Sequence, residues 1–202
     1  MGEVVDSKFV SKIDVTSYGR RTKEYLDVLS PSVDVWEIGN EVNGEWLGST
    51  PDVVAKISAA YELVKQRKKP TALTLYYNEG CWLRADHEMF AWADRNVPAA
   101  MKDGLDYVLV SYHEDDCHGS KPDWAAVFHH LAAMFPTSEL GFGECGTVRA
   151  DAKENSLADY YRTRPAEDRF VGGYFWWYFS QDMVPRSKPL WKVLYQVMMS
   201  PG

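Results

Sequence analysis

The sequence predicts a single α/β domain in which helices cover a parallel sheet. Five short apolar runs alternate with amphipathic segments, and the connections between them are short. Strands that alternate with helices imply a parallel sheet, because each new strand is reached through a crossover. The runs are almost continuously apolar, as expected when helices cover the sheet. A chain of 202 residues that is 46% hydrophobic is large enough for one domain with a sizeable core, so residues 1–202 are treated as one unit.

The first elements are indicated by helical spacing and by apolar runs. Residues 20–30 are expected to form a helix and residues 33–41 a strand. The next helix is expected over residues 50–67, with Thr50 as N-cap and Pro51 at the first helical position. Its apolar residues recur at helical spacing, at Val53, Val54, Ile57, Ala60, Tyr61 and Val64.

The later elements continue the same alternation to the end of the chain. Further strands are expected over residues 71–78, 105–113, 139–144 and 170–180. Further helices are expected around Met89–Trp92, after a cap at Asp123, and over residues 154–164 and 188–199. Before residue 20 the pattern is poor, and the segment Phe9–Val15 is expected to supply at most one irregular strand.

Polar residues follow every expected strand, and they favour one of two possible architectures. The candidates are a doubly wound open sheet and a (β/α)8 barrel. The nucleotide-binding version of the open sheet is disfavoured, because the sequence has no G-x-x-x-x-G-K and its one G-x-G-x-x-G match, at residues 141–146, begins inside an expected strand rather than after it. In a barrel, the C-terminal strand ends form the active face. The residues found at those ends are Glu41, Asn78, His113, Glu144 and Ser180.

Two of these strand ends carry a glutamate beside glycine residues. Glu41 closes the run Val33–Glu41, and Glu144 closes the run Leu140–Glu144. Two carboxylates at strand ends, with aromatic side chains on the neighbouring ends, are the minimum equipment for cleaving a glycosidic bond. Each glutamate alone is more simply explained as a solvated residue that opens a loop, and the matching position of the second glutamate favours catalysis.

The ordered set of motifs resembles the clan A glycoside hydrolases, from about residue 20 to residue 200. The motif Gly39-Asn40-Glu41 is similar to the end of the fourth strand in that clan, and Gly143-Glu144 is similar to the end of the seventh. Ser111-Tyr112-His113 and Trp177-Tyr178-Phe179-Ser180 are similar to the ends of the sixth and eighth strands. The resemblance implies a (β/α)8 TIM-barrel fold, an acid/base role for Glu41 and a nucleophilic role for Glu144.

The chain departs from this family in its length before Glu41. If Glu41 follows the fourth strand, the first two to three βα units are lacking, and five to six units are visible. A full barrel takes ~250 residues, and an open sheet leaves two unpaired edges. We therefore expect an incomplete TIM-barrel type, which a missing N-terminal segment or self-association would complete.

Further residues are expected to serve the two carboxylates. A Tyr112 hydroxyl or a His113 ring would hydrogen-bond Glu144 and keep it ionised, and the Asn40 amide suits a sugar 2-hydroxyl. Trp177 offers a flat ring surface to a pyranose ring. That Trp177 points inward, rather than toward the helices, is implied by the resemblance alone. Trp46 and Trp82 are expected to form apolar walls that raise the pKa of Glu41.

Other acidic residues compete for these roles. Glu37 has the same strand parity as Glu41 and is expected to be buried in a pair with a cation, and Glu79 ends a strand and is a rival catalytic residue. The run Glu114-Asp115-Asp116 lies between His113 and His118, but these residues fit no zinc spacing. A solvated loop is expected there, with a calcium-binding or substrate-contacting loop as the alternative. No metal or cofactor is expected.

Two other functions remain open beside a retaining glycosidase. The first is an inactive, truncated barrel that binds carbohydrate or acts within a larger assembly. The second and weaker alternative is a metal-dependent hydrolase that uses the 113–118 loop. The sequence does not specify the sugar, the linkage, or the choice between endo and exo attack.

Composition narrows the possible partners. The formal net charge is −7, and no Lys/Arg cluster has interleaved aromatics, which argues against a nucleic-acid partner. The chain contains no run of ~20 apolar residues and no apolar core near Met1 of the kind found in signal peptides, so neither a membrane partner nor a signal is expected.

The three cysteines leave two alternatives open, a Cys81–Cys117 bridge or a set of free thiols, and Cys145 is the third cysteine. The cellular compartment is therefore open.

Overall fold

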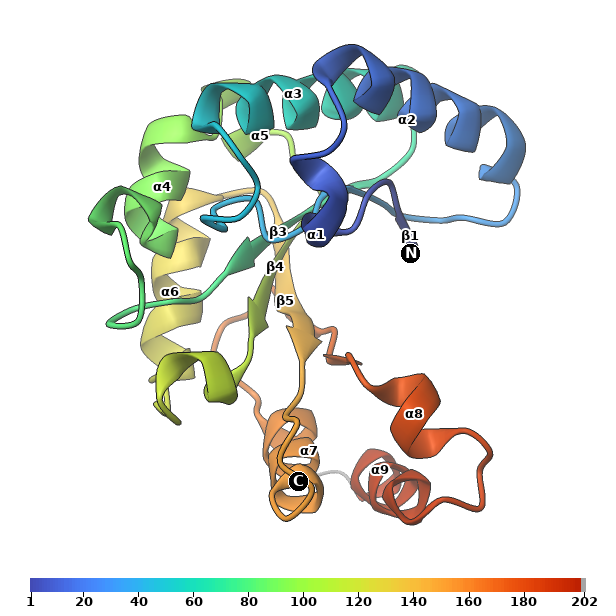
Figure 1. The fold of residues 1–202 in the computed structure, drawn as a ribbon, viewed down its shortest axis with the longest axis vertical. Coiled ribbons are helices and arrows are strands. Elements are labelled where there is room, and N and C mark those ends of the chain that lie inside the picture. Colours follow the sequence, from blue (N-terminus) through green and yellow to red (C-terminus); the bar gives the residue numbers. More distant parts are fainter. Residues whose placement is uncertain (201–202) are drawn as a thin grey trace.

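Residues 1–200, described by a computed structural model, form a parallel sheet flanked by helices (Figure 1). The expected class, α/β with a parallel sheet, is confirmed. Strands pair in the order β1-β2-β3-β4-β5-β6, and β7 also pairs with β5. The strands are β1 (Gly2–Glu3), β2 (Trp36–Gly39), β3 (Thr71–Tyr76), β4 (Tyr107–Tyr112), β5 (Glu139–Cys145), β6 (Phe170–Gly172) and β7 (Phe175–Trp176).

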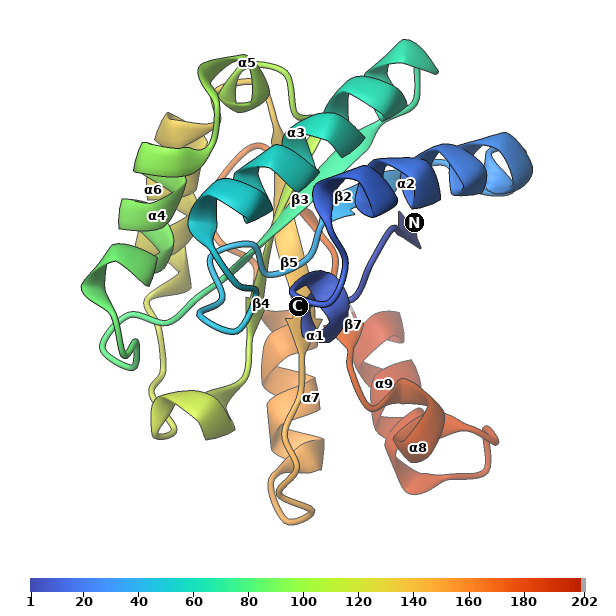
Figure 2. The ribbon, with the colours of Figure 1, turned by 45° about the horizontal axis from the view of Figure 1, so that its top comes forward.

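The helices form an arc around the sheet in Figure 1, from α2 through α3, α4 and α6 to α7 and α9. Helix α1 lies apart from this arc, near the strand ends (Figure 2). The α-helices are α1 (Ser7–Val10), α2 (Val15–Leu29), α3 (Thr50–Gln66), α4 (Met89–Asn96), α5 (Ala99–Lys102), α6 (Trp124–Met134), α7 (Lys153–Arg162), α8 (Phe179–Met183) and α9 (Pro189–Met199). Two 3-10 turns, η1 (Ala85–His87) and η2 (Glu114–Cys117), lie in the loops after β3 and β4.

Two of the helix starts can be compared with the expected caps. Asp123 caps α6 as expected, because its carboxylate accepts a hydrogen bond from the Ala126 amide. Helix α3 begins at Thr50, and its N-cap is Ser49 rather than the expected Thr50. The Ser49 hydroxyl accepts from the Asp52 amide at 3.3 Å. Ser and Thr have the same capping chemistry, so the sequence did not separate these neighbours.

The expected strand over residues 170–180 is wrong. It is divided into β6 and β7, and residues 179 and 180 already belong to α8. The break falls at Gly172, Gly173 and Tyr174, whose φ values are 103°, 95° and 65°. A Cβ on Gly173 would lie 1.9 Å from the Phe142 carbonyl oxygen, so only glycine fits this approach. Beyond the break the chain resumes pairing with β5 as β7.

The expected irregular strand over Phe9–Val15 is also wrong. Phe9 lies in α1, and Val15 begins α2. The first strand is instead the two-residue β1, in which Gly2 pairs with Trp36 of β2. A strand of two residues is too short to show any periodicity, so no pattern in the sequence indicates it.

The two faces of the sheet differ in polarity. The face under the helices carries buried apolar side chains, including Trp36, Ile38, Leu73, Leu75, Val108, Val110, Leu140 and Phe142. The opposite face carries Glu37, Thr74, Ser111 and Gly143. The Thr74 hydroxyl hydrogen-bonds the Glu37 carboxylate, and a Cβ on Gly143 would lie 2.9 Å from Ser111 Oγ. Side-chain alternation along the strands therefore separates the apolar face under the helices from the opposite face, which carries polar side chains and is called the interior face below.

A disulfide joins two loops at the C-terminal ends of neighbouring strands. Cys81, in the loop after β3, is bonded to Cys117 at the end of η2. This confirms the bridge alternative for these two residues. Cys145 is a buried free thiol at the end of β5.

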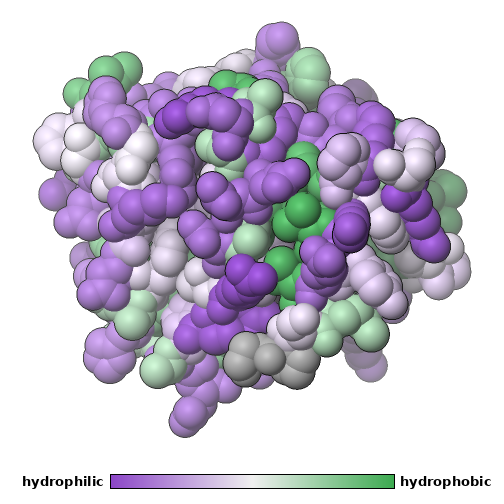
Figure 3. All heavy atoms as spheres, turned by 90° about the horizontal axis from the view of Figure 1, so that it is seen from below, coloured by the Kyte–Doolittle hydropathy of each residue, from purple (hydrophilic) through white to green (hydrophobic). Residues whose placement is uncertain are grey.

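Polar side chains dominate the face shown in Figure 3, with a small group of apolar residues among them. Within residues 1–200, no helix is both long enough and apolar enough to span a bilayer.

Candidate active site

The C-terminal strand ends surround a cleft of about 520 Å³. Of the eight residues expected from the sequence to form the site, six line this cleft: Glu41, Trp46, Trp82, His113, Glu144 and Trp177. They come from the loops after β2, β3 and β4, from β5, and from the residue after β7. The prediction that distant strand ends converge on one rim is therefore met by these residues.

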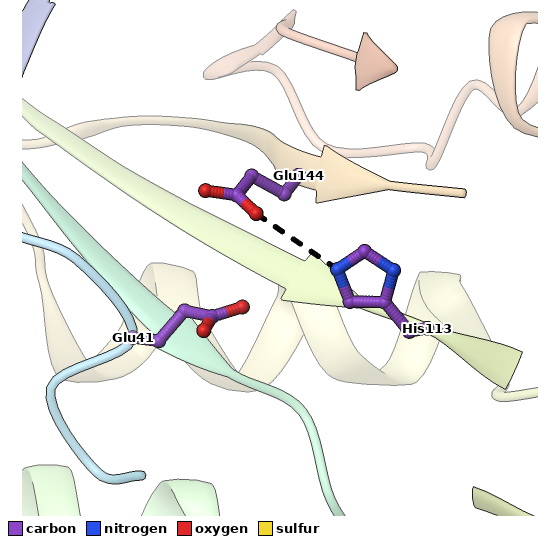
Figure 4. A group of neighbouring side chains, drawn as sticks. All are labelled: Glu41, His113 and Glu144. Carbon is purple, nitrogen blue, oxygen red and sulfur yellow. Dashed lines mark ion pairs between the residues drawn. The ribbon is translucent and has the colours of Figure 1, made fainter. Parts of the chain in front are cut away.

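The two glutamates face each other across this cleft (Figure 4). One oxygen of Glu41, one oxygen of Glu144 and one ring nitrogen of His113 all lie within 4.8 Å of one another. His113 Nε2 lies 3.9 Å from Glu144 Oε2, beyond hydrogen-bond distance, so the expected hydrogen bond from the His113 ring is not formed. The three groups come from three different strand ends.

The Asn40 side chain links the end of β2 to the Glu144 carboxylate of β5. Its Nδ2 donates to Glu144 Oε1 at 3.1 Å and lies 3.2 Å from Glu37 Oε1. Its Oδ1 accepts from the Ser7 amide at 3.1 Å. Asn40 is almost fully buried. In this structure its amide therefore holds the Glu144 carboxylate in place, and its contact with a sugar 2-hydroxyl stays a prediction.

Ser7, at the start of α1, is a site residue that sequence reasoning missed. Its hydroxyl donates to Glu41 Oε2 at 2.9 Å, and its backbone amide donates to Asn40. The short helix α1 thus fixes two consecutive residues of the loop after β2. A single serine in a poorly patterned segment carries no sequence signal for such a contact, which is made across 34 positions of the chain.

The surroundings separate the acidities of the two glutamates. Burial, followed by the negative charge of Glu144, raises the pKa of Glu41 to about 8, and the Ser7 hydrogen bond acts in the opposite direction. Burial raises the pKa of Glu144 to about 7, while the Asn40 hydrogen bond and the Lys8 charge lower it. The group with the higher pKa retains its proton when the other is ionised, which is the division of roles between an acid and a nucleophile.

The backbone around both glutamates is unusual. Glu41 has a φ of 51°, in the left-handed region, which costs a residue with a Cβ about 1–2 kcal/mol. Such strain persists where the surroundings hold it in place, often at functional sites. The Glu144 amide donates to Ser111 Oγ at 2.9 Å. Gly143 allows this approach, because a Cβ there would lie 2.9 Å from both Ser111 Oγ and the Thr74 methyl.

The expected role of Tyr112 is wrong. Its side chain is fully buried, and its hydroxyl donates to the Ser120 carbonyl at 2.6 Å rather than to Glu144. The ring packs against Tyr77 and Trp124 in the core. The cause is strand alternation, because the neighbouring Ser111 occupies the interior face and Tyr112 must point to the opposite one.

The expected pairing of Glu37 with a cation is also wrong. Its carboxylate accepts hydrogen bonds from the Thr74 hydroxyl and from Asn40, which are uncharged. Glu37 is buried as expected, and burial raises its pKa. The interior face of the sheet therefore gathers acidic groups around Glu144.

The rival acidic residues have other hydrogen-bond or ion-pair partners. Glu79 is exposed, accepts from the Tyr77 hydroxyl at 2.6 Å, and lies outside the lining of the cleft. In the 113–118 loop each carboxylate has its own partner. Asp115 accepts from the Val148 amide at 2.7 Å, Asp116 accepts from the Tyr76 hydroxyl at 3.2 Å, and Glu114 pairs with Lys121 at 2.6 Å.

Metal-ligand atoms do come together within residues 1–200, but in a different place from the one considered above. The group is Glu41, His113 and Glu144, whereas the acidic residues 114–116 are not part of it. Two carboxylates and one imidazole are donors that many divalent cations accept. The same three groups are also those that an acid/base and nucleophile pair requires.

A scan of protein-family models and a search of curated proteins return no match to this chain.

Proposed function

We propose that this chain is a retaining glycoside hydrolase, with Glu41 as acid/base and Glu144 as nucleophile. The observation that carries the proposal is the approach of their carboxylate oxygens to within 4.8 Å. Retaining enzymes hold the two carboxyl groups ~5–5.5 Å apart, and inverting enzymes need ~6.5–9.5 Å to admit a water between them. An approach of one oxygen from each group to within 4.8 Å is compatible with the retaining spacing, in which Glu144 attacks directly.

The sheet topology supports a barrel as the finer fold. The strand order follows the chain order from β1 to β6, whereas the order in a doubly wound sheet reverses at a switch point. Both ends of the sheet border one cavity of about 240 Å³, which is lined by Glu3 of β1 and Phe175 of β7. We therefore infer an incomplete (β/α)8 barrel in which β2 and β5 correspond to the fourth and seventh strands. Two further βα units, from an N-terminal segment or another copy, would close it.

In the first step, one Glu144 oxygen attacks the anomeric carbon of the bound sugar. The bond from that carbon to the glycosidic oxygen breaks, and its electron pair leaves with the oxygen. Glu41 supplies the proton that the departing oxygen takes up, so a glycosyl ester on Glu144 and a neutral leaving group result. Burial of Glu41 keeps this proton available at a pH where Glu144 is ionised.

In the second step, the ionised Glu41 takes a proton from a water molecule. The water oxygen bonds to the anomeric carbon, and the ester bond to Glu144 breaks with its electrons returning to the carboxylate. The product keeps its original anomeric configuration, and Glu41 is again protonated. His113 lies beside the Glu144 carboxylate, while Trp177 borders the cleft on the same side as Glu144.

Glutamine substitutions test these roles. Glu41→Gln and Glu144→Gln should each abolish hydrolysis of the aryl glycosides that the wild type cleaves, while circular dichroism and thermal unfolding stay near wild type. Glu79→Gln is the matched control, because Glu79 also follows a strand but lies outside the cleft. Full activity of Glu144→Gln on every responsive substrate would contradict the role assigned to Glu144.

Metal-dependent hydrolysis is the second candidate, because Glu41, His113 and Glu144 present three ligand-type atoms within 4.8 Å. Activity in excess chelator separates the two candidates. The glycosidase proposal predicts full activity after dialysis against EDTA, whereas a metal-dependent enzyme would lose its activity and regain it with added zinc or manganese. The remaining alternative, a carbohydrate-binding protein without turnover, predicts saturable sugar binding and no hydrolysis.

A further inference from the structure

Two exposed tryptophans stand on one side of the carboxylate pair. Trp46 and Trp82 expose 43% and 40% of their surface and both line the cleft. Trp46 follows Glu41 in the loop after β2, and Trp82 belongs to the loop after β3. Glu144 and Trp177 come instead from β5 and from the end of β7. Because β2 and β3 are neighbours in the sheet and β5 lies two strands beyond β3, we place Trp46 and Trp82 on the Glu41 side of the cleft.

The loop that carries Trp82 is fixed at several points. The neighbouring Cys81 is bonded to Cys117, and one Glu45 oxygen accepts hydrogen bonds from the amides of residues 83 and 84. Asn78 fixes the loop ends, since its side chain donates to the His87 carbonyl and accepts from the Met89 amide. A long loop with this many anchors is already ordered, so little further conformational entropy is lost when a ligand packs against its exposed aromatic ring.

Trp46 is held in a similar way. Its ring packs edge-on against Tyr76, with the ring centroids 5.2 Å apart. Glu45, the residue before it, is the acceptor that joins this loop to the Trp82 loop. The two rings are therefore mounted on loops that Glu45 ties to each other.

The charges around the cleft define the ligand further. The carboxylates of Asp6, Glu45, Asp116 and Glu144 line it beside the protonated Glu41, with Lys8 as the single lysine among the lining residues. Lys8 lies over the Trp177 ring, with its Nζ 4.8 Å from the ring centroid. Such an acidic lining repels a carboxylated sugar and leaves uncharged saccharides free to enter.

We propose that Trp46 and Trp82 form the subsite for the leaving-group sugar, so that the substrate is an uncharged oligosaccharide spanning the cleft. This inference rests on the proposed function, because the leaving group is defined by the acid/base role of Glu41. The bond to be cleaved lies between Glu41 and Glu144, so the sugar that is attacked lies on the Glu144 side. The sugar released with the Glu41 proton extends toward Trp46 and Trp82.

The test compares two substrates of the sugar that the wild type accepts. One is a neutral oligosaccharide of three to five units, and the other is the corresponding glycosyl fluoride, whose leaving group is too small to reach the tryptophans. Trp46→Ala and Trp82→Ala should each lower the ratio of kcat/KM on the oligosaccharide to kcat/KM on the fluoride by about tenfold, a usual cost of truncating a contacting aromatic. Tyr195→Ala, an exposed aromatic of α9 outside the cleft, should leave the ratio unchanged.

The possible outcomes are distinguishable. An active wild type with unchanged ratios in both tryptophan variants would overturn the subsite and leave the glycosidase proposal standing. Faster cleavage of oligogalacturonate than of every neutral oligosaccharide would overturn the uncharged substrate. A wild type that cleaves neither the fluorides nor any oligosaccharide of the panel would overturn the proposed function, and the subsite with it. Thermal unfolding of each variant controls for loss of folding.

Discussion

Asn40 Nδ2 donates a hydrogen bond to Glu144 Oε1 at 3.1 Å, which joins two strand ends that are 104 positions apart in the sequence. Glu41 is the next residue after Asn40, so the same loop presents the proposed acid/base and orients the proposed nucleophile. The Ser7 amide in turn holds the other end of the Asn40 side chain. The relative placement of the two carboxylates thus depends on one buried amide.

The wild-type pH profile is the first prediction. Activity should rise as Glu144 loses its proton near pH 7 and fall as Glu41 loses its proton near pH 8, because attack needs an ionised Glu144 and a protonated Glu41. The measurement is kcat/KM against pH on a responsive aryl glycoside. A rate that keeps rising with pH above both values would contradict the acid role of Glu41.

Removal of the Asn40 amide should affect the acidic limb of this profile. The hydrogen bond from Asn40 favours the ionised form of Glu144, so Asn40→Ala should raise the pKa of Glu144 and move the acidic limb to higher pH. Loss of a hydrogen bond to a charged group is worth ~1.5–3 kcal/mol, so kcat/KM should fall by roughly 10- to 100-fold. An unmoved acidic limb would show that Asn40 does not act on Glu144.

Removal of the Ser7 hydroxyl should move the opposite limb. Its hydrogen bond lowers the pKa of Glu41, so in Ser7→Ala the carboxyl should keep its proton to higher pH and the basic limb should shift upward. A merely structural role would lower activity at every pH without moving the limb. Ser180→Ala, at an exposed position of α8, is the matched control and should leave the profile as in the wild type.

Glu37 gives a prediction about stability. Burial raises its pKa above 4.5, so the folded state binds this proton more tightly than the unfolded state does. Its contribution to stability is fully present below pH 4.5 and is lost as the pH rises through the folded-state pKa. Glu37→Gln should therefore raise the free energy of unfolding at pH 8, by on the order of 1 kcal/mol, and change it less at pH 4.5.

Urea unfolding of both proteins at the two pH values measures this difference. The glutamine oxygen can still accept hydrogen bonds from Thr74 and Asn40, so the comparison isolates the charge. A destabilised Glu37→Gln at pH 8 would show that the buried carboxylate is favourable as an ion.

The sequence predicted the class of fold and most of the cleft, because both depend on local patterns. Apolar runs located β2, β3, β4 and β5, and a polar residue after each run indicated the functional end of the sheet. Glu41, His113 and Glu144 were found in this way, and they meet within 4.8 Å. The barrel itself stays a proposal, because parallel strands of this kind also occur in open sheets.

The contacts that were missed are those between segments without a pattern. The two-residue β1 and the placement of Ser7 depend on tertiary packing. Tyr112 was assigned to the wrong face because alternation fixes only relative orientation, and nothing local distinguishes the interior face from the helix-covered one. Glu37 was expected to pair with a cation, whereas it accepts hydrogen bonds from two neutral donors, Thr74 of β3 and Asn40 of the loop after β2.

Chemical trapping tests the central proposal most directly. A 2-deoxy-2-fluoroglycosyl fluoride of the accepted sugar should inactivate the wild type and add one glycosyl unit, because the fluorine slows hydrolysis of the ester more than its formation. Mass spectrometry of the digested protein should locate the added mass on Glu144, and Glu144→Gln should remain unlabelled. Labelling of another residue in an active enzyme, or full activity after prolonged exposure to the reagent with no added mass, would contradict the account.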